Sequence, residues 1–330
     1  MIRPDGTPAA TAFNLGAIGA GLAFESSLSA LRDALGGSGR PGAAVIQAPP
    51  GTGKTTLVPP LLANLYGEHG RVVVTQPRRV AARAAARRLA ALDGSRLDVG
   101  RRGGRVGYTV RGEHRAGPDT RIEFVTPGIL LRRLLADPAL EGTAAVVLDE
   151  VHERGLETDL LVGMLAEVRA LRGDLAVVAM SATLDAPRFA ALLGDPDGGG
   201  PAPVVDCPSV NHPLKVQWLP APAPRLDARG VTRAFLDHVA AAAAGAHARA
   251  VAADGSVDAL VFLPGAREVS HVAAALRSRL GRDADVLELH GQVAAAEQDR
   301  AVSGRAPGDP PRIIVSTDLA ESSLTVPGVR

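Results

Sequence analysis

The sequence predicts two doubly wound α/β domains in series, each with a parallel sheet covered by helices. The length of 330 residues exceeds that of an ordinary single α/β domain. From about residue 26, short β-branched apolar runs alternate with helical stretches rich in Ala and Leu, which is typical of a parallel sheet buried on both faces. Hydrophobic residues make up 46% of the chain and charged residues 22%, a composition that can fill two cores.

The predicted strands and helices divide the chain into three parts. A break of the type Asp-Pro-Asp-Gly-Gly-Gly within 194–203 supports neither helix nor strand. We therefore expect a flexible N-terminus at 1–25, a first domain at 26–203 and a second domain at 204–330. The expected strands are 43–47, 71–75, 122–125, 144–148 and 176–180 in the first domain, and 214–219, 259–263, 286–289 and 312–316 in the second. Helices are expected from Lys54, from about Arg78 and over 231–244, with a helix end and loop at 241–256.

Charge and composition exclude several classes of protein. The formal net charge of +1 gives no global sign of nucleic-acid binding, so any such surface must come from local clusters of arginine. Aromatic residues are 3% of the chain, which argues against a platform of stacked bases. The single cysteine, Cys207, cannot form an internal disulfide. No signal peptide or bilayer-spanning apolar run is found, so we expect a soluble cytoplasmic protein without a membrane partner.

A phosphate-binding loop is predicted between the first strand and the helix that follows it. Its residues are Ala48, Pro49, Pro50, Gly51, Thr52, Gly53, Lys54, Thr55 and Thr56. Glycines let backbone N–H groups close around phosphates, and the helix N-terminus adds its positive dipole end. In this pattern Lys54 reaches the β and γ phosphates and Thr55 ligates Mg²⁺. Lys54 and Lys215 are the chain's two lysines, so a lysine inside this loop indicates chemistry and not composition.

A second site is predicted where an apolar strand ends in the acidic sequence Asp149-Glu150-Val151-His152. Strand carboxyl ends are where ligands bind in this fold class. Asp149 can hold Mg²⁺ through water, and Glu150 can contribute to the metal site and deprotonate the attacking water. Alone, these residues would be better interpreted as a solvated acidic loop. The loop at Ala48–Thr55, about a hundred residues upstream on the same predicted sheet, makes that interpretation unfavourable.

The two motifs together resemble those of the DEAH-box helicases of superfamily 2, and further segments fit the same family. The Ala-Pro-Pro-Gly loop and the run 297–301 are most similar to its bacterial HrpB-type branch. Matches to the family's motifs extend from about residue 43 to the last residue: 75–82 resembles motif Ia, 126–128 motif Ib, 181–183 motif III, 261–265 motif IV, 289–291 with 297–298 the next segment, and 316–325 motif V. The resemblance implies tandem RecA-like domains, the second incomplete.

The resemblance also implies roles for particular residues and ligands. Contacts to the RNA backbone would come from Arg78, Arg79, Thr126, Pro127, Gly128 and Thr317. Ser181, Ala182 and Thr183 would link hydrolysis to domain movement, and His152 would act across the cleft between the domains. The expected ligands are ATP, Mg²⁺ and single-stranded or partly duplex RNA, with DNA left open. Other nucleoside triphosphates are expected as well, because no aromatic residue is found near Val302, where eukaryotic members stack adenine.

Two departures from the family pattern bear on activity. Pro327 stands where an acidic residue often follows motif V, and motif VI, with its catalytic arginines, would lie beyond Arg330. We therefore expect the 330 residues to bind Mg-ATP but to hydrolyse it slowly.

Two alternatives to an RNA helicase remain. A P-loop kinase or transporter ATPase would leave Ser181-Ala182-Thr183 and Thr317 unexplained. A non-catalytic ATP- or RNA-binding module is the other alternative.

Overall fold

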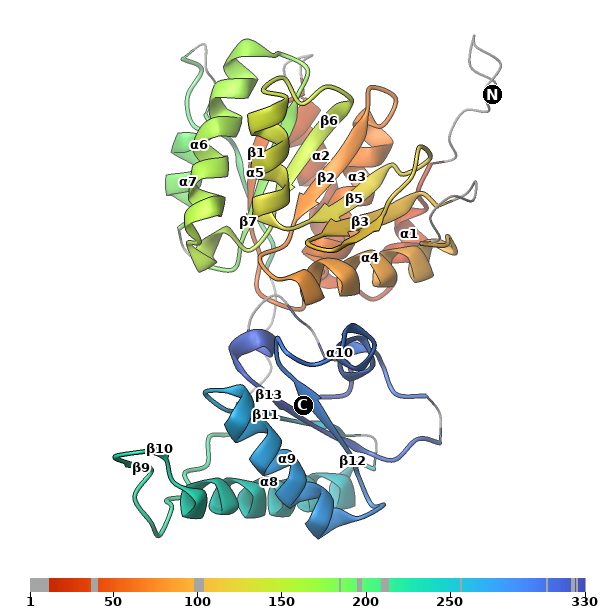
Figure 1. Cartoon of the computed structure of the whole chain (residues 1–330). Helices are drawn as coiled ribbons and strands as arrows, with labels where there is room; N and C mark the ends of the chain where they lie inside the picture. Colours follow the sequence, from red (N-terminus) through yellow and green to blue (C-terminus); the bar gives the residue numbers. More distant parts are fainter. Residues whose placement is uncertain are drawn as a thin grey trace. The chain divides into compact units, whose positions relative to one another are not determined.

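The computed structural model describes residues 12–36, 41–97, 104–183, 185–194, 198–208, 214–255, 257–306, 308–321, 324 and 326–329. The chain divides into two compact units between Val210 and Asn211. Each unit contains parallel strands flanked by helices, which confirms the predicted fold class. Figure 1 shows both units with most of their helices and strands labelled.

The first unit is built on an eight-stranded sheet, counted over the described residues, with the order β4-β3-β5-β2-β6-β7-β1-β8. All neighbouring strands run parallel except β3 and β4. The strands are β1 Ala43–Gln47, β2 Arg71–Thr75, β3 Val106–Val110, β4 Glu113–Arg115, β5 Ile122–Val125, β6 Thr143–Leu148, β7 Ala176–Ser181 and β8 Val204–Asp206.

Helices cover both faces of this sheet and produce two separate hydrophobic cores (Figure 1). Successive residues of a strand point to opposite faces, so Val72 and Val74 belong to one core and Val73 to the other. The helices on the first face are α1 Leu15–Gly19, η1 Ala23–Ser27, α2 Leu28–Gly36, α3 Lys54–Tyr66 and α4 Arg79–Asp93. Those on the second face are α5 Pro127–Ala136, α6 Leu156–Leu171 and α7 Ala186–Leu192, while the short η2 Val151–Glu153 follows β6.

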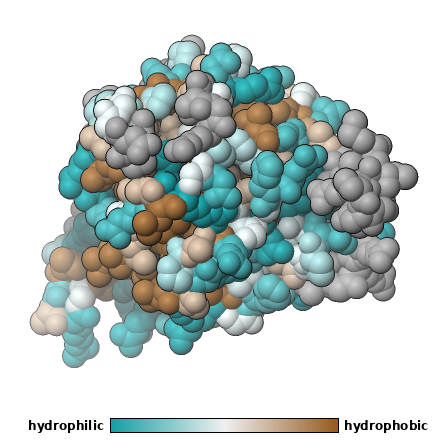
Figure 2. All heavy atoms as spheres, turned by 90° about the horizontal axis from the view of Figure 1, so that it is seen from above, coloured by the Kyte–Doolittle hydropathy of each residue, from teal (hydrophilic) through white to brown (hydrophobic). Residues whose placement is uncertain are grey.

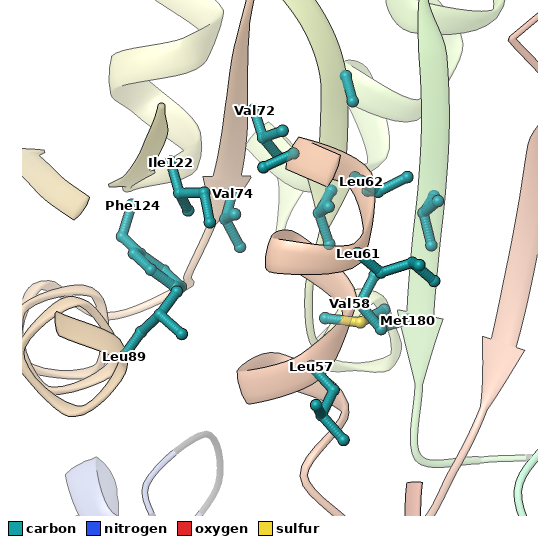
Figure 3. Packing of buried hydrophobic residues seen from close by; sticks show 14 of the residues in the cluster. Leu57, Val58, Leu61, Leu62, Val72, Val74, Leu89, Ile122, Phe124 and Met180 are labelled. Carbon is teal, nitrogen blue, oxygen red and sulfur yellow. The ribbon is translucent and has the colours of Figure 1, made fainter. Parts of the chain in front are cut away.

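The central helix α3 holds the first core together. Figure 3 shows Leu57, Leu61 and Leu62 of α3 among the buried side chains of the strands, and Leu89 of α4 directed toward Phe124 of β5. These residues are fully or almost fully buried. Each fully buried Leu or Phe side chain contributes roughly 1.5–3 kcal/mol through the hydrophobic effect. The predicted phosphate-binding loop is therefore attached to a helix that is held firmly in the core.

Parallel pairing brings the ends of the central strands to one edge of the sheet. Thr75 at the end of β2 is paired with Leu148 of β6 on one side and with Val125 of β5 on the other. Gln47 of β1 is paired with Ser181 of β7. The residues that follow these strands therefore emerge at the same edge. They include most of the predicted site residues.

The second unit has a smaller parallel sheet in the order β11-β13-β12 and a two-stranded hairpin, over the described residues. Its core packs α8 and α9 against the sheet through Leu236, Val272, Leu276, Ile313 and Val315. The elements are β9 Leu226–Asp227, β10 Gly230–Val231, α8 Arg233–Ala253, β11 Ala259–Phe262, α9 Ala266–Leu280, β12 Asp285–Leu289, α10 Ala295–Val302, β13 Arg312–Ser316 and η3 Asp318–Ala320.

The expectation of a flexible N-terminus is wrong for residues 12–25; residues 1–11 lie outside the described part. Phe13, Ile18 and Phe24 are buried in the first core. Asn64 accepts a hydrogen bond from Phe13 N at 2.8 Å and donates one to Phe13 O at 2.9 Å. The Arg105 guanidinium lies 4.2 Å from the centre of the Phe13 ring. Contacts with distant residues order this segment, and they leave no periodic pattern in the sequence.

Three other expectations about elements need correction. Val204–Asp206, assigned to the second domain, forms β8 and pairs with β1 of the first unit. Residues 214–219 form no strand, and Leu214, Val216 and Trp218 are 88%, 63% and 86% exposed. A strand also needs a neighbouring strand to pair with, and an alternating apolar pattern does not show whether one is present. α8 continues to Ala253, beyond the expected helix end. The break at 195–197 lies outside the described residues.

Large hydrophobic side chains are exposed at several positions of the described residues. Figure 2 shows hydrophobic residues in several separate places among hydrophilic ones. In the described residues, the exposed large hydrophobics of the first unit include Leu135, Leu156, Leu171 and Leu192. None of the described helices combines the length and the apolar character needed to cross a membrane.

A fully buried carboxylate, Glu123 of β5, links this strand to its two neighbours, β2 and β3, and to α5. Arg133 of α5 donates to both of its oxygens at 3.0 and 2.6 Å, Arg71 of β2 donates at 2.7 Å, and Thr109 of β3 donates at 2.6 Å. Burial opposes ionisation, but the charge and hydrogen bonds of Arg133, with those of Thr109 and Arg71, lower the pKa of Glu123 to about 2. The ionised form is therefore part of the folded structure.

Replacing Glu123 with Gln should lower the free energy of unfolding at pH 7 by about 2–3 kcal/mol, because two guanidinium groups lose their shared charge partner. A lowered pKa gives stability that is present above the unfolded pKa of about 4.3 and is lost as the pH falls toward 2. The difference between parent and variant should therefore narrow over that window in urea unfolding at several pH values. Glu141→Gln, at an exposed position, is the control and should match the parent; a difference that is independent of pH would refute the assignment.

Candidate functional site

The loop between β1 and α3 has the backbone conformation that a phosphate-binding loop requires. Gly51 and Gly53 have φ angles of 79° and 94°, in the left-handed region that favours glycine. Gly53 caps the N-terminus of α3, and Thr52 Oγ1 donates to Pro49 O at 2.9 Å within the loop. The predicted residues from Ala48 to Thr56 thus turn directly into the helix N-terminus, where free backbone N–H groups favour anions.

The N-terminal segment contacts this loop, which sequence analysis did not anticipate. Phe24 N donates to Thr52 O at 2.9 Å. A Cβ on Gly53 would lie 2.7 Å from Leu22 Cδ1, so this position accepts only glycine without a shift of Leu22. The segment around Leu22 and Phe24 therefore packs against the loop. The sequence holds no signal for this contact apart from two isolated apolar residues.

Asp149, directly after β6, receives hydrogen bonds from the N-terminus of α3 and from the residue after β2. Thr55 Oγ1 of α3 and Gln76 Nε2 after β2 both donate to Asp149 Oδ2 at 2.6 Å. Its second oxygen, Oδ1, accepts from Glu150 N at 2.9 Å. Asp149 is 2% exposed, so the carboxylate is held at one position in the protein interior. Sequence analysis placed Thr55 and Asp149 together and missed Gln76.

Glu150 forms a buried ion pair with the loop lysine. Lys54 Nζ lies 3.2 Å from Glu150 Oε1, and the two residues are 4% and 8% exposed. Glu150 has a φ of 55°, a costly conformation for a residue with a side chain. Burial and the neighbouring charge of Asp149 raise the pKa of Glu150 to about 7, although Lys54 opposes them. A carboxyl group with a pKa near neutrality can accept and release a proton at physiological pH.

His152 links Glu150 to the segment after β7. Ala182 N donates to His152 Nδ1 at 3.2 Å, so this nitrogen carries no proton. Its other nitrogen, Nε2, then bears the proton and lies 3.2 Å from Glu150 Oε2, where it can donate. Burial and the charge of Lys54 lower the pKa of His152, which favours this neutral form. The imidazole is thus fixed between an acidic side chain and a backbone amide.

Ser181, Ala182 and Thr183 form a compact turn at the end of β7. Ser181 O accepts from Ala48 N at 3.0 Å, which joins the turn to the start of the phosphate-binding loop. Ser181 Oγ and Thr183 Oγ1 lie 3.3 Å apart, and Thr183 N donates to Ser181 Oγ at 3.2 Å. With the His152 contact, the turn touches both predicted motifs of the first unit.

The residues expected to contact RNA in the first unit follow β2 and β5 at the same sheet edge. Arg78 caps α4 in an extended conformation, and Arg79 is its first helical residue and is exposed. Thr126 caps α5, and Pro127 occupies its first turn. A Cβ on Gly128 would lie 2.8 Å from Glu157 Oε1, at the end of a flexible exposed side chain. Two helix N-termini therefore open at this edge, an arrangement that suits phosphates.

Thr317 belongs to the second unit, where it follows β13 at the carboxyl end of the strand. It is half-buried, and its hydroxyl accepts from Leu319 N at 3.4 Å. Val302 aligns near the position where eukaryotic members stack adenine on an aromatic residue. It is the last residue of α10 and is buried. Ser322, Ser323 and Thr325 of the predicted motif V, and Arg330, lie outside the described residues.

The oxygen atoms around Asp149 fit a magnesium ion. Thr55 Oγ1 and Asp149 Oδ2 supply a hydroxyl and a carboxylate oxygen at one point, and Mg²⁺ prefers oxygen ligands. In the described part of the chain, no group of three or more His, Cys, Asp or Glu could hold a metal ion. Mg²⁺ in phosphate-binding sites takes one or two protein ligands together with phosphate and water.

Comparison with known protein families matches both units. Residues 28–190 match the DEAD/DEAH box helicase family, and residues 249–330 match the helicase conserved C-terminal domain. The chain belongs to the DEAH-box helicases. Its site geometry and the HrpB-type resemblance of its motifs agree with this assignment.

Similar helicases include two proteins of Escherichia coli (strain K12). The chain is 37% identical to the ATP-dependent RNA helicase HrpB over 287 residues, which are 87% of this chain and 32% of HrpB. It is 33% identical to the ATP-dependent RNA helicase HrpA over 291 residues, 87% of this chain and 20% of HrpA. The crystal structure of Escherichia coli DEAH/RHA helicase HrpB aligns with a TM-score of 0.74 and 36% identity, covering 94% of this chain and 36% of that one. The chain thus spans about a third of the length of HrpB.

Proposed function

We propose that this chain is the nucleotide-hydrolysing and RNA-binding portion of an ATP-dependent RNA helicase that moves along single-stranded RNA and separates duplexes. The observation that supports it best is the convergence of Lys54, Thr55, Asp149 and Glu150 through direct contacts at 2.6 and 3.2 Å. Four groups with the chemistry for phosphate, metal and water meet at one sheet edge. A structural turn would not bury a lysine and two carboxylates there.

Each group has a defined part in the proposed hydrolysis. Backbone N–H groups of the loop and the Lys54 ammonium bind the β and γ phosphates of ATP. Thr55 and Asp149 would hold Mg²⁺, which neutralises charge that develops on the phosphates during transfer. Glu150 orients the attacking water and accepts its proton. His152 positions Glu150 through Nε2, and its Nδ1 accepts a hydrogen bond from Ala182 in the turn at Ser181–Thr183.

RNA would bind at the same sheet edge through its backbone. These residues follow the adjacent strands β2 and β5 and supply cationic groups and helix N-termini: Arg78, Arg79, Thr126, Pro127 and Gly128. Contacts to phosphate position a strand without reading its sequence. We propose single-stranded RNA as the ligand, with Thr317 as a further contact in the second unit. Preference for DNA over RNA in competition binding would contradict the choice of polymer.

Lys54→Ala should reduce nucleotide turnover by about 100-fold to 1,000-fold and also weaken ATP binding, because the phosphates lose their nearby ammonium. The measurement is phosphate release together with titration of a fluorescent ATP analogue. Lys215→Ala, which removes the chain's other lysine at an exposed position in the second unit, is the matched control. Parent-like turnover in Lys54→Ala would show that the loop does not serve hydrolysis.

Glu150→Gln should bind Mg-ATP almost as well as the parent but hydrolyse it about 100-fold to 10,000-fold more slowly, because an amide cannot accept the proton of water. Single-turnover hydrolysis and equilibrium binding separate the two effects. Equal losses of binding and turnover would assign Glu150 to the metal site and not to proton transfer.

Replacing Arg78 and Arg79 together with Ala should weaken binding of RNA irrespective of base sequence. The slope of log affinity against log salt should become shallower by about one to two, as expected for two lost phosphate contacts. The control is Arg87 with Arg88, an adjacent exposed pair further along the same helix. The phosphate role is wrong if the two double variants have the same slope.

A further inference from the structure

Gln76 is a buried polar residue that has no role in the hydrolysis proposed above. It follows β2 directly and is 2% exposed. Its side-chain Nε2 donates to Asp149 Oδ2 at 2.6 Å. The orientation of the amide is fixed by this contact, since a carboxylate oxygen requires an N–H donor and would repel the amide oxygen. Gln76 therefore holds one of the two residues proposed to ligate Mg²⁺.

The backbone of Gln76 is attached to the proposed RNA-binding elements on both sides. Its N–H donates to Val125 O at 2.8 Å, and Val125 immediately precedes Thr126, the cap of α5. Two residues further along the chain is Arg78, the cap of α4, with only Pro77 between them. Proline fixes its own φ angle and restricts the residue before it. A displacement at Gln76 is therefore passed to both helix N-termini.

Asp149 Oδ2 is shared in a way that makes this contact sensitive to the bound ligand. Its two hydrogen bonds come from Thr55 Oγ1 and Gln76 Nε2, both at 2.6 Å. Thr55 is also a proposed metal ligand: its hydroxyl oxygen can offer a lone pair to a metal ion while its proton stays on Oδ2, and a metal ion bound there would draw charge from Oδ2. The balance of contacts at Oδ2 then changes, and Gln76 is the other donor on that atom.

Stability alone does not account for a glutamine at this position. Among the described residues, Gln76 Oε1 is buried and has no hydrogen-bond partner. A buried amide oxygen without a partner is unfavourable, and an apolar side chain of similar volume would avoid that cost. A residue kept at a cost to stability is expected at a functional site.

We propose that Gln76 is a positioning residue that couples the Mg-nucleotide site to the RNA-binding edge, acting through Asp149 on one side and through Arg78 and Thr126 on the other. This inference rests on the proposed function. It assigns energetic coupling between two ligands to one hydrogen bond. Such coupling is reciprocal, so RNA must tighten nucleotide binding by the same factor as nucleotide tightens RNA binding.

The test measures this factor in the whole chain with a non-hydrolysable ATP analogue, Mg²⁺ and single-stranded oligouridine. Affinity for the analogue is determined with and without RNA. Gln76→Leu should lower the coupling factor by about fivefold or more and raise the Mg²⁺ concentration that supports half-maximal binding by about tenfold. Gln76→Asn keeps the amide but is one methylene too short to reach Asp149 Oδ2, so it should behave like Gln76→Leu.

A variant that is less stable but keeps the contact between Gln76 and Asp149 distinguishes an effect on coupling from an effect on folding. Val73→Ala shortens a buried side chain on the same strand, away from Asp149. It should lower the unfolding temperature and leave the coupling factor and the Mg²⁺ dependence unchanged. Gln76→Leu should do the opposite and unfold within a few degrees of the parent.

The outcomes distinguish this inference from the proposed function. A parent chain that fails to bind the analogue or the oligouridine would remove the proposed function itself. If the parent binds both with coupling and Gln76→Leu keeps the factor and the Mg²⁺ dependence, Gln76 has no coupling role. A Gln76→Asn variant with the coupling factor and Mg²⁺ dependence of the parent would also overturn the inference, since coupling would then not need the contact with Asp149. Loss of coupling in Val73→Ala as well would reduce the effect to general destabilisation of β2.

Discussion

The carboxylate of Asp149 is the point on which the rest of the site depends. Because β2 and β6 pair in parallel register, with Thr75 opposite Leu148, the residues after them emerge side by side. Thr55 reaches the same oxygen from α3, whose position is set by its own buried face. One carboxylate thus connects the loop after β1 with the ends of β2 and β6. Any change in sheet register would separate these groups, since a shift of one residue moves every side chain to the other face.

Beyond Asp149, the site continues as a chain of contacts through Glu150 and His152 to the turn after β7. Lys54 holds one oxygen of Glu150, and His152 approaches the other. The imidazole can make both of its contacts only as the neutral tautomer with the proton on Nε2. Ala182 N and Ala48 N then tie the turn at Ser181 to the histidine and to the loop. Lys54 of the loop is therefore joined to the end of β7 by a continuous series of polar contacts.

Most of the candidate site could be proposed from the sequence because its residues lie in short segments. The loop at 48–56 and the acidic box carry their residues next to one another, and the rule that parallel strands end at one edge brought them together. Gln76 was missed because strand order cannot be derived from chain order, so nothing indicated that β2 is the neighbour of β6. The hairpin of β3 and β4 was also missed, although Arg111-Gly112 is a sequence signal for a tight turn, and Gly112 has a φ of 84° in the structure. Leu22 and Phe24 had none, since their partners lie far along the chain.

Two buried glutamates of the first unit, Glu123 and Glu150, differ in their pKa because their neighbours differ. Glu123 has three donors on its oxygens, and its pKa falls to about 2. Glu150 is also buried, but Lys54 is the cation that opposes the charge of Asp149, and the neutral His152 lies at its other oxygen; burial and Asp149 raise its pKa to about 7. Its backbone is also in the left-handed region, which adds strain. A carboxylate that is fully compensated stabilises the fold, whereas one left undercompensated at a strand end keeps its capacity to exchange a proton. The difference lies in the neighbours and not in the residue type.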